Sequence, residues 1–213
     1  MNLVIKIGGH LCFDENGPNI NYMNRLVKTI KKVDKKYKIS IVIGGGIFVR
    51  KYIRNFTRLD KKLTNNQTEW IAIQLLRANV LLFSYLLNKK PVFSINEITS
   101  NCVIGGIKPG RCTDTNAAIA AKKTKSILIK ITDVDGIYDK DPKKYKNAKM
   151  LSKISFNELK TKRKTAPGRY GILDPIALKI IKQNKIKTYV INGKDPENII
   201  KLLNGAKIGT EIG

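Results

Sequence analysis

The 213-residue chain has few acidic residues, a single histidine and only three cysteines. Cys12, Cys102 and Cys112 have no metal-binding spacing, and an odd count does not suit a disulfide framework, so we expect a reduced, cytoplasmic protein. The longest nearly apolar run, residues 80–87, is far shorter than the ~20 residues that a membrane span needs, and we expect no membrane association. No secretory signal is visible, because the apolar start is short and is interrupted by Lys6.

Acidic residues number 16 against 41 lysines and arginines, which gives a formal net charge of +25. Lysine supplies 33 of the 41 basic residues, so the charge can reflect the composition of an AT-rich genome as well as a polyanionic partner. The lysines are spread over several amphipathic segments and are not interleaved with aromatic residues, as a stacking surface for single strands requires. We therefore expect nucleic-acid binding to be incidental and sensitive to salt.

Apolar strand patterns alternate with amphipathic helix patterns along almost the whole chain, with no repeat or linker. This alternation predicts an α/β fold in which a mainly parallel sheet is covered on both faces. Strands are expected at residues 3–7, 39–43, 91–95, 101–104, 126–131, 187–191 and 207–212, and helices at 23–33, from 47, at 66–86, 113–123 and 174–184, and from 195. Ser155 and Glu158 have the spacing of a capping box that opens a short helix, and residues 160–171 are expected to form an exposed loop.

Two glycine-rich turns lie between a predicted strand and a predicted helix. Residues 6–10 (KIGGH) end the first strand, and residues 44–46 (GGG) end the second. Backbone amides in such turns bind anions, and Lys6 can place an ammonium group beside them. A plain turn with a surface lysine explains the first motif equally well, whereas a plain turn rarely needs three glycines. Neither motif is a Walker A loop or a dinucleotide-binding G-x-G-x-x-G.

A third motif, residues 105–114 (GGIKPGRCTD), places Lys108 and Arg111 in a glycine-rich loop. A helix follows it, and Thr113 or Asp114 can cap that helix. The arrangement suits an anionic ligand, although an exposed loop is an equally good interpretation.

The fourth motif, residues 131–142 (ITDVDGIYDKDP), directly follows a buried strand. Asp133 is placed to orient a lysine, Tyr138 to flank a base and Asp141 to accept ribose hydroxyls. Metal binding by these acidic residues is possible, but their spacing is not that of an EF-hand loop.

In this order the four motifs resemble the amino-acid kinase superfamily, and within it the archaeal type of UMP kinase (uridylate kinase). The resemblance covers nearly the whole chain and includes VIKIGG (4–9), QLLRAN (74–79) and LDPIALKII (173–181). It implies one domain over residues 1–213, a three-layer α/β/α sandwich of the carbamate kinase-like fold. Residues 1–122 would form the UMP-binding half and residues 123–213 the ATP-binding half.

The same resemblance implies transfer of the γ-phosphate of ATP to UMP, giving ADP and UDP in pyrimidine nucleotide biosynthesis. Mg²⁺ would be carried on the nucleotide, with no tightly held protein metal site, and the chain would form a homo-oligomer, a hexamer built as a trimer of dimers. Lys6 and Asp133 would be catalytic; ATP would contact Gly9, His10, Gly46, Arg50, Thr132, Asp133, Tyr138 and Asp141; and UMP would contact Gly45, Glu69, Ile107, Lys108, Pro109, Gly110, Arg111, Cys112 and Thr113.

Three residues depart from the pattern of this family. His10 stands where relatives usually have a small or polar residue, Glu69 stands where an aspartate usually holds the UMP ribose, and Asp133 replaces an asparagine that is common in archaeal UMP kinases. The segment between residues 91 and 105 is also shorter than in relatives. Three alternatives remain at this point: another superfamily kinase such as an isopentenyl phosphate kinase or an acetylglutamate kinase, a non-catalytic nucleotide-binding module, and a basic nucleic-acid-binding protein. Arg50 counts against an isopentenyl phosphate kinase, which would need a histidine shortly after the GGG turn.

Overall fold

The structure is a computed structural model that describes residues 1–56, 63–142, 144–159 and 172–213. Its centre is an eight-stranded sheet in the order β3-β4-β2-β1-β5-β9-β10-β8. A short hairpin-like pair, β6 and β7, lies apart from it. The strands are β1 (Asn2–Ile7), β2 (Lys38–Ile43), β3 (Lys90–Val92), β4 (Cys102–Ile104), β5 (Ile127–Thr132), β6 (Ile137–Tyr138), β7 (Met150–Leu151), β8 (Lys153–Ile154), β9 (Thr188–Asn192) and β10 (Thr210–Ile212).

The sheet is mostly parallel, as the alternation of strands and helices predicts. β3, β4, β2, β1, β5 and β9 all pair in parallel, and β10 pairs antiparallel with β9. β1, β2 and β5 are buried along nearly their full length, which explains their almost continuous apolar sequences. Because these strands run in the same direction, their carboxyl ends all lie at one edge of the sheet.

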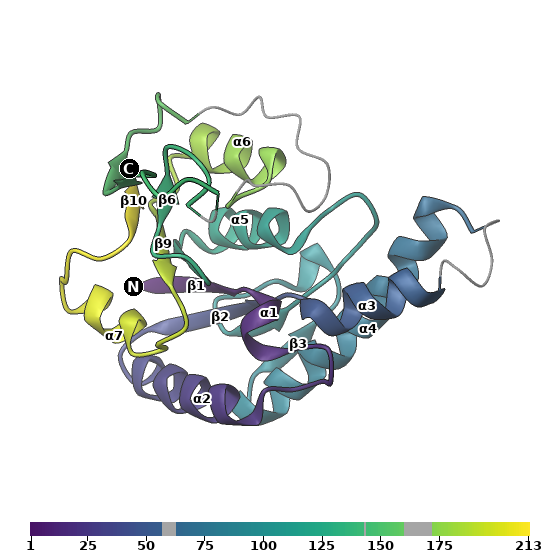
Figure 1. Ribbon diagram of the computed structural model, residues 1–213. Coiled ribbons are helices and arrows are strands. Elements are labelled where there is room, and N and C mark those ends of the chain that lie inside the picture. Colours follow the sequence, from purple (N-terminus) through teal and green to yellow (C-terminus); the bar gives the residue numbers. More distant parts are fainter. Residues whose placement is uncertain (57–62, 143, 160–171) are drawn as a thin grey trace.

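Helices cover both faces of this sheet (Figure 1). Side chains of α2 and α4 share one core with Leu3, Ile5 and Ile7 of β1, and those of α5 and α6 share the other core with Val4. The predicted three-layer α/β/α fold is thus confirmed. The helices are α1 (Gly9–Cys12), α2 (Ile20–Asp34), α3 (Gly46–Phe56), α4 (Asn65–Leu87), α5 (Thr113–Thr124), α6 (Pro175–Gln183) and α7 (Asn198–Leu203), with a 3-10 turn, η1 (Ile95–Glu97).

Helix α6 begins at the residue that its sequence predicts, whereas the N-cap of α5 differs from the prediction. Asp174 caps α6 by accepting from two backbone amides, and Pro175 takes the first helical position, as predicted. The N-cap of α5 is Cys112, so neither Thr113 nor Asp114 caps it; Asp114 lies inside the first turn with its side chain engaged elsewhere.

The Ser155–Glu158 box forms both of its hydrogen bonds but closes only a turn. The predicted short helix is therefore absent from residues 155–159. The two hydrogen bonds of the box close a single turn, and no helical residues follow it within this range. The expected loop at residues 160–171 lies outside the described residues.

One of the described helices, α4, is long and apolar enough to cross a membrane by length and composition alone. The expectation from the longest apolar run missed it, because its apolar residues are interrupted by small and neutral polar ones. In the fold, Val80, Phe83 and Leu87 of α4 pack into the core beside the sheet. A core helix of a soluble protein passes the same test, so this finding does not by itself point to a membrane.

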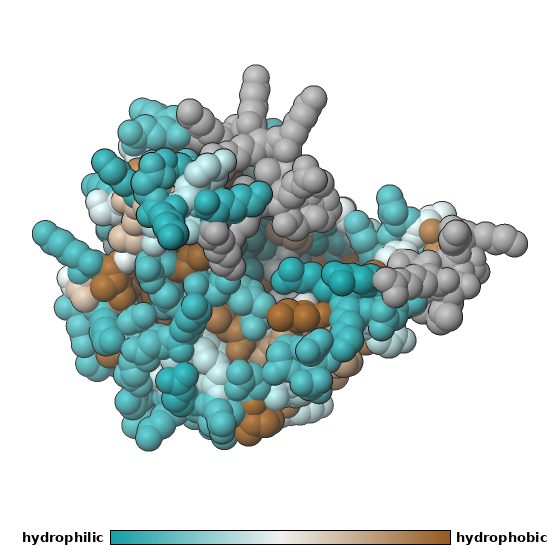
Figure 2. All heavy atoms as spheres, in the orientation of Figure 1, coloured by the Kyte–Doolittle hydropathy of each residue, from teal (hydrophilic) through white to brown (hydrophobic). Residues whose placement is uncertain are grey.

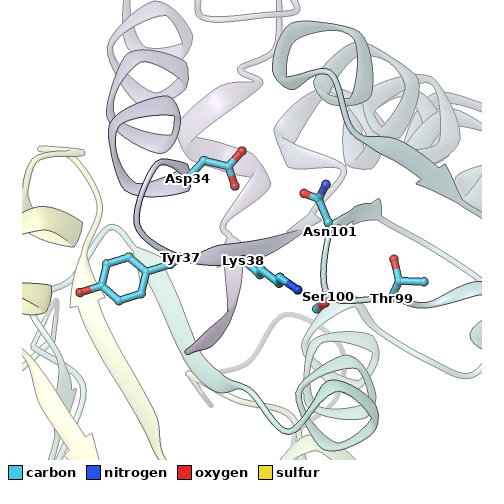
Figure 3. Close-up of a pocket in the computed structure, with 6 residues that line it drawn as sticks. All are labelled: Asp34, Tyr37, Lys38, Thr99, Ser100 and Asn101. Carbon is cyan, nitrogen blue, oxygen red and sulfur yellow. The ribbon is translucent and has the colours of Figure 1, made fainter.

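A buried lysine ties three elements together at the amino ends of the strands. Lys89, at the start of β3, donates to Asp34 Oδ1 at 2.7 Å and also to Asn101 Oδ1. A small cavity of about 390 Å³ lies beside this ion pair (Figure 3). Ligands of parallel α/β sheets collect at the opposite, carboxyl edge, so we assign a structural role to this cluster. The cavity is lined by Asp34, Tyr37, Lys38, Thr99, Ser100 and Asn101.

Removing Asp34 should destabilise the protein more than removing Lys89. Asp34→Ala leaves a buried ammonium without its carboxylate, and we expect a loss of roughly 2–3 kcal/mol in the free energy of unfolding. Lys89→Met replaces that ammonium with an apolar chain of similar length and leaves a carboxylate that water reaches, so its loss should be smaller. Urea denaturation of both variants checks the order; equal losses would contradict this account of the pair.

Candidate active site

The two glycine turns pack directly against each other at the carboxyl ends of β1 and β2. A Cβ atom at Gly9 would lie 2.3 Å from the amide nitrogen of Gly46 and 2.6 Å from the carbonyl carbon of Gly44. Gly46 itself has a φ of +73°, which an L side chain rarely adopts. Glycine is thus required because any side chain would prevent the two loops from packing together. This packing brings the starts of α1 and α3 side by side at the candidate site.

Lys6 lies at the centre of this edge and is paired with a carboxylate. Its Nζ is 3.0 Å from Asp114 Oδ1, and Lys130 Nζ is 2.7 Å from Asp114 Oδ2. Lys6 and Lys130 are direct neighbours in the parallel register of β1 and β5. Asp114, from the first turn of α5, therefore lies between two neighbouring ammonium groups with one oxygen toward each. All three side chains are largely buried.

Burial and charge act in opposite directions within this triad. Burial lowers the pKa of Lys130 to about 8, although Asp114 partly offsets this by stabilising the ammonium form. Burial alone would raise the pKa of Asp114, but the two lysines outweigh it and hold that pKa below its usual range. The carboxylate is therefore ionised at neutral pH.

A cavity of about 660 Å³ opens beside the triad, between α4 and the starts of α5 and α6. The predicted acceptor loop forms one of its walls, and Glu69 Oε2 accepts a 2.5 Å hydrogen bond from the amide of Gly110 in that loop. Ile107 does not line the cavity, because its side chain is buried in the core under α5 and α6. The other predicted acceptor residues that line it are Gly45, Glu69, Lys108, Pro109, Gly110, Arg111, Cys112 and Thr113.

Asp174 closes the far end of the cavity and is fully engaged in hydrogen bonds. Besides capping α6, its carboxylate accepts from Thr115 Oγ1 at 2.8 Å and from Cys112 Sγ at 2.7 Å. Burial, followed by the nearby Asp114, raises the pKa of Cys112 to about 11, so its thiol stays protonated. Cys112, Asp114 and Asp174 place three potential metal ligands within 4.8 Å of one another, but two lysines already neutralise Asp114.

The residues expected to contact ATP lie on the segments that follow β1 and β2 and at and beyond the carboxyl end of β5. His10 Nε2 is 3.4 Å from Asp133 Oδ1, so the two lie face to face across the edge. The carboxylate beside Lys6 is that of Asp114, because α5 brings its first turn over the sheet. That Asp133 orients a lysine stays a prediction. Thr132, at the end of β5, accepts from the amide of Gly193.

The remaining donor-side residues lie farther out. The Tyr138 hydroxyl, in β6, is 3.3 Å from Asp135 Oδ2, and partial burial together with this carboxylate raises the pKa of the phenol. Asp141 follows in a turn, where its carbonyl accepts from two backbone amides. Arg50 is exposed on α3. These side chains border the same edge as the glycine turns.

The sequence analysis missed four residues of this region: Lys130, Asp114, Asp174 and Asn192. Lys130 could have been found from the sequence, because it lies within the apolar strand sequence ILIKIT in the same way that Lys6 lies within LVIKI. Asp114 and Asp174 were read as helix caps. Asn192, which donates to Asp135 Oδ1 at 2.7 Å, ends β9 without any motif around it.

Comparison with known proteins agrees with this geometry. The sequence model of the amino acid kinase family matches residues 1–104 and 86–192. The uridylate kinase of Thermococcus kodakarensis is 31% identical and that of Sulfurisphaera tokodaii 34% identical, each over 100% of this chain and 99% of the relative. The crystal structure of uridylate kinase from Archaeoglobus fulgidus superposes with a TM-score of 0.84 at 31% identity, covering 100% of both chains. UMP kinase from Ureaplasma parvum gives a TM-score of 0.79 at 29% identity, over 99% of this chain and 97% of that one.

Asp114→Asn should destabilise the protein strongly, because it removes the one charge that both buried lysines share. We expect a loss of roughly 3–5 kcal/mol in the free energy of unfolding at neutral pH. Asp133→Asn is the matched control: its side chain is 30% exposed and faces one histidine, so its loss should be less than half as large. Urea denaturation at pH 7 measures both, and equal effects would show that the triad does not depend on Asp114.

Proposed function

The chain belongs to the amino acid kinase family, and from this premise we propose that it is a UMP kinase that transfers the γ-phosphate of ATP to UMP, forming ADP and UDP. The observation that carries the proposal is the full-length correspondence, in sequence and in fold, with proteins named uridylate kinase. The site supports this proposal, because two packed glycine turns, the buried triad of Lys6, Asp114 and Lys130, and a cavity meet at one edge of the sheet.

The donor nucleotide is assigned to the glycine turns and the carboxyl end of β5. Gly9 and Gly46 follow the carboxyl ends of β1 and β2, near Lys6 on β1, and backbone amides in such turns bind phosphate oxygens. Residues 123–213 would thus contribute the adenosine pocket, with Mg²⁺ arriving on the nucleotide as part of the substrate. The assigned contacts are Gly9, His10, Gly46, Arg50, Thr132, Asp133, Tyr138 and Asp141.

The acceptor is assigned to the 660 Å³ cavity, which is lined mainly by residues from the 1–122 half, together with residues 174–176 at the start of α6. One guanidinium nitrogen of Arg111 is buried there without a hydrogen-bond partner among the described residues, so a donor is available to an anion. Glu69 is placed to hold ribose hydroxyls, in exchange for its bond to the amide of Gly110. The backbone of the 107–113 loop supplies the remaining contacts, including those at Ile107, whose side chain points into the core.

The chemistry requires positioning and positive charge rather than a general base. The UMP phosphate is already an anionic nucleophile, and phosphoryl transfer spreads negative charge over the transferred oxygens. Lys6, aimed by Asp114, and the glycine-turn amides stabilise that charge. Removing one such preorganised donor costs roughly 10²–10³-fold in turnover.

The deciding experiment measures Mg-ATP-dependent ADP release with UMP, CMP, isopentenyl phosphate and acetylglutamate as separate acceptors. We expect strong turnover with UMP, and Lys6→Ala should stay folded but lose roughly 10²–10³-fold in kcat. Turnover with another acceptor would keep the donor assignments and overturn those of the cavity. No turnover from folded protein that binds ATP would indicate a non-catalytic nucleotide-binding module.

A homo-oligomer forms part of the proposal, and α4 offers a surface for it. Its exposed residues recur at helical spacing and form a neutral stripe, although the chain as a whole carries a charge of +25. Within α4 the charged residues are Glu69 and Arg77, and neither belongs to this stripe. Two copies of a strongly basic chain can approach each other where lysine is absent, so the partner that fits is a second copy, within a hexamer built from dimers. The stripe comprises Gln67, Trp70, Gln74, Ala78, Leu81 and Tyr85.

A single charge in the stripe should break this contact. Tyr85 is 77% exposed in the chain by itself, so Tyr85→Glu should leave the fold intact and shift the mass in analytical ultracentrifugation toward a smaller oligomer. Ile20→Glu, at an exposed apolar position on α2, is the control and should leave the mass unchanged. A wild-type monomer, or an unchanged oligomer in Tyr85→Glu, would contradict the assignment of this surface.

A further inference from the structure

Two lysines occupy the centre of an otherwise apolar row that crosses five strands. In the parallel register, Ile104, Val42, Lys6, Lys130 and Val190 are successive neighbours on β4, β2, β1, β5 and β9. Neighbours in one row point to the same face, here the face covered by α5 and α6. Placing two like charges side by side in such a row is unfavourable unless a counter-charge lies between them, and Asp114 is that counter-charge.

Lys130 makes a second contact that Lys6 does not make. Its Nζ also donates to the carbonyl oxygen of Ile172, two residues before Asp174. Asp174 in turn holds Thr115 and Cys112 at the end of the acceptor cavity. Lys130 therefore connects three elements around the site: β5 on the donor side, the first turn of α5, and the segment that leads into α6.

We propose, on the basis of the kinase function above, that Lys130 is a positioning residue for phosphoryl transfer. By holding one oxygen of Asp114 and the carbonyl of Ile172, it fixes the carboxylate that aims Lys6 at the transferred phosphate. Lys130 does not line the cavity and is almost completely buried, so it acts through Asp114 and Lys6 rather than on the substrate.

A neutral side chain at position 130 changes the aim of Lys6 without removing Lys6. In Lys130→Met, Asp114 keeps one ammonium partner but loses the contact that fixes its second oxygen. The carboxylate can then rotate toward Lys6 and draw its ammonium group away from the site. A displacement of about 1 Å in a positioned group can cost about 10²-fold in rate.

The test is a double-mutant cycle on UMP-dependent ADP release by the full chain. We expect Lys130→Met to lower kcat by about 10²-fold and to change the KM values for UMP and ATP by less than about 3-fold. In a Lys6→Ala background the same substitution should cost less than about 3-fold, because the residue through which it acts is already gone. A merely structural role predicts that the two losses multiply.

Lys89→Met is the matched control, since Lys89 is also buried and also paired with an aspartate, but it directly precedes β3 at the opposite edge of the sheet. It should lower the free energy of unfolding and leave kcat within about 2-fold of wild type.

If Lys130→Met does not fold, Lys130→Gln is measured instead, because it removes the charge and keeps a hydrogen-bond donor. A folded variant with kcat within about 3-fold of wild type, or multiplying losses in the cycle, would overturn the proposal. A wild-type chain that releases no ADP with UMP would fail at the proposed function itself, whatever the variants do.

Discussion

The arrangement of the site depends on one shared carboxylate. Parallel pairing of β1 and β5 forces Lys6 and Lys130 to lie next to each other on a buried face, and Asp114 lies between them as their shared counter-charge. Because Asp114 belongs to the first turn of α5, it also determines where that helix begins over the sheet. The position of α5 in turn shapes the loop before it, which walls the acceptor cavity. An electrostatic requirement inside the core thus governs the geometry of the binding surface.

The glycine turns add a steric requirement to this electrostatic one. Gly9 and Gly46 are in such close contact that no side chain fits between their loops, and this contact holds the ends of β1 and β2 together. The amides that would bind phosphate are consequently preorganised by packing within the protein. The same residues can therefore be read as structural and as functional, and in this fold the two roles are inseparable.

Helix α4 combines three tasks along one sequence. Its inner face packs into the core, Glu69 near its start reaches the acceptor loop, and its neutral outer stripe lies exposed. The face displayed in Figure 2 is mostly hydrophilic, with hydrophobic residues in small groups. These combined tasks explain why α4 is apolar enough to resemble a membrane span although it lies in a layer of an α/β/α sandwich.

The alternation of strands and helices, the parallel sheet and the two glycine turns can be predicted from the sequence, because periodicity and turn chemistry are local properties. The motifs also identify the family, since they occur in order along the whole chain. The tertiary structure adds that Asp114 pairs with Lys6, that Lys130 is the neighbour of Lys6 on β5, and that Asp174, besides capping α6, accepts hydrogen bonds from Thr115 and Cys112. Residues 6, 114 and 130 are far apart in sequence, and strand register and helix placement alone bring them together. The box at Ser155 and Glu158 shows that a local pattern can form its hydrogen bonds without producing a helix.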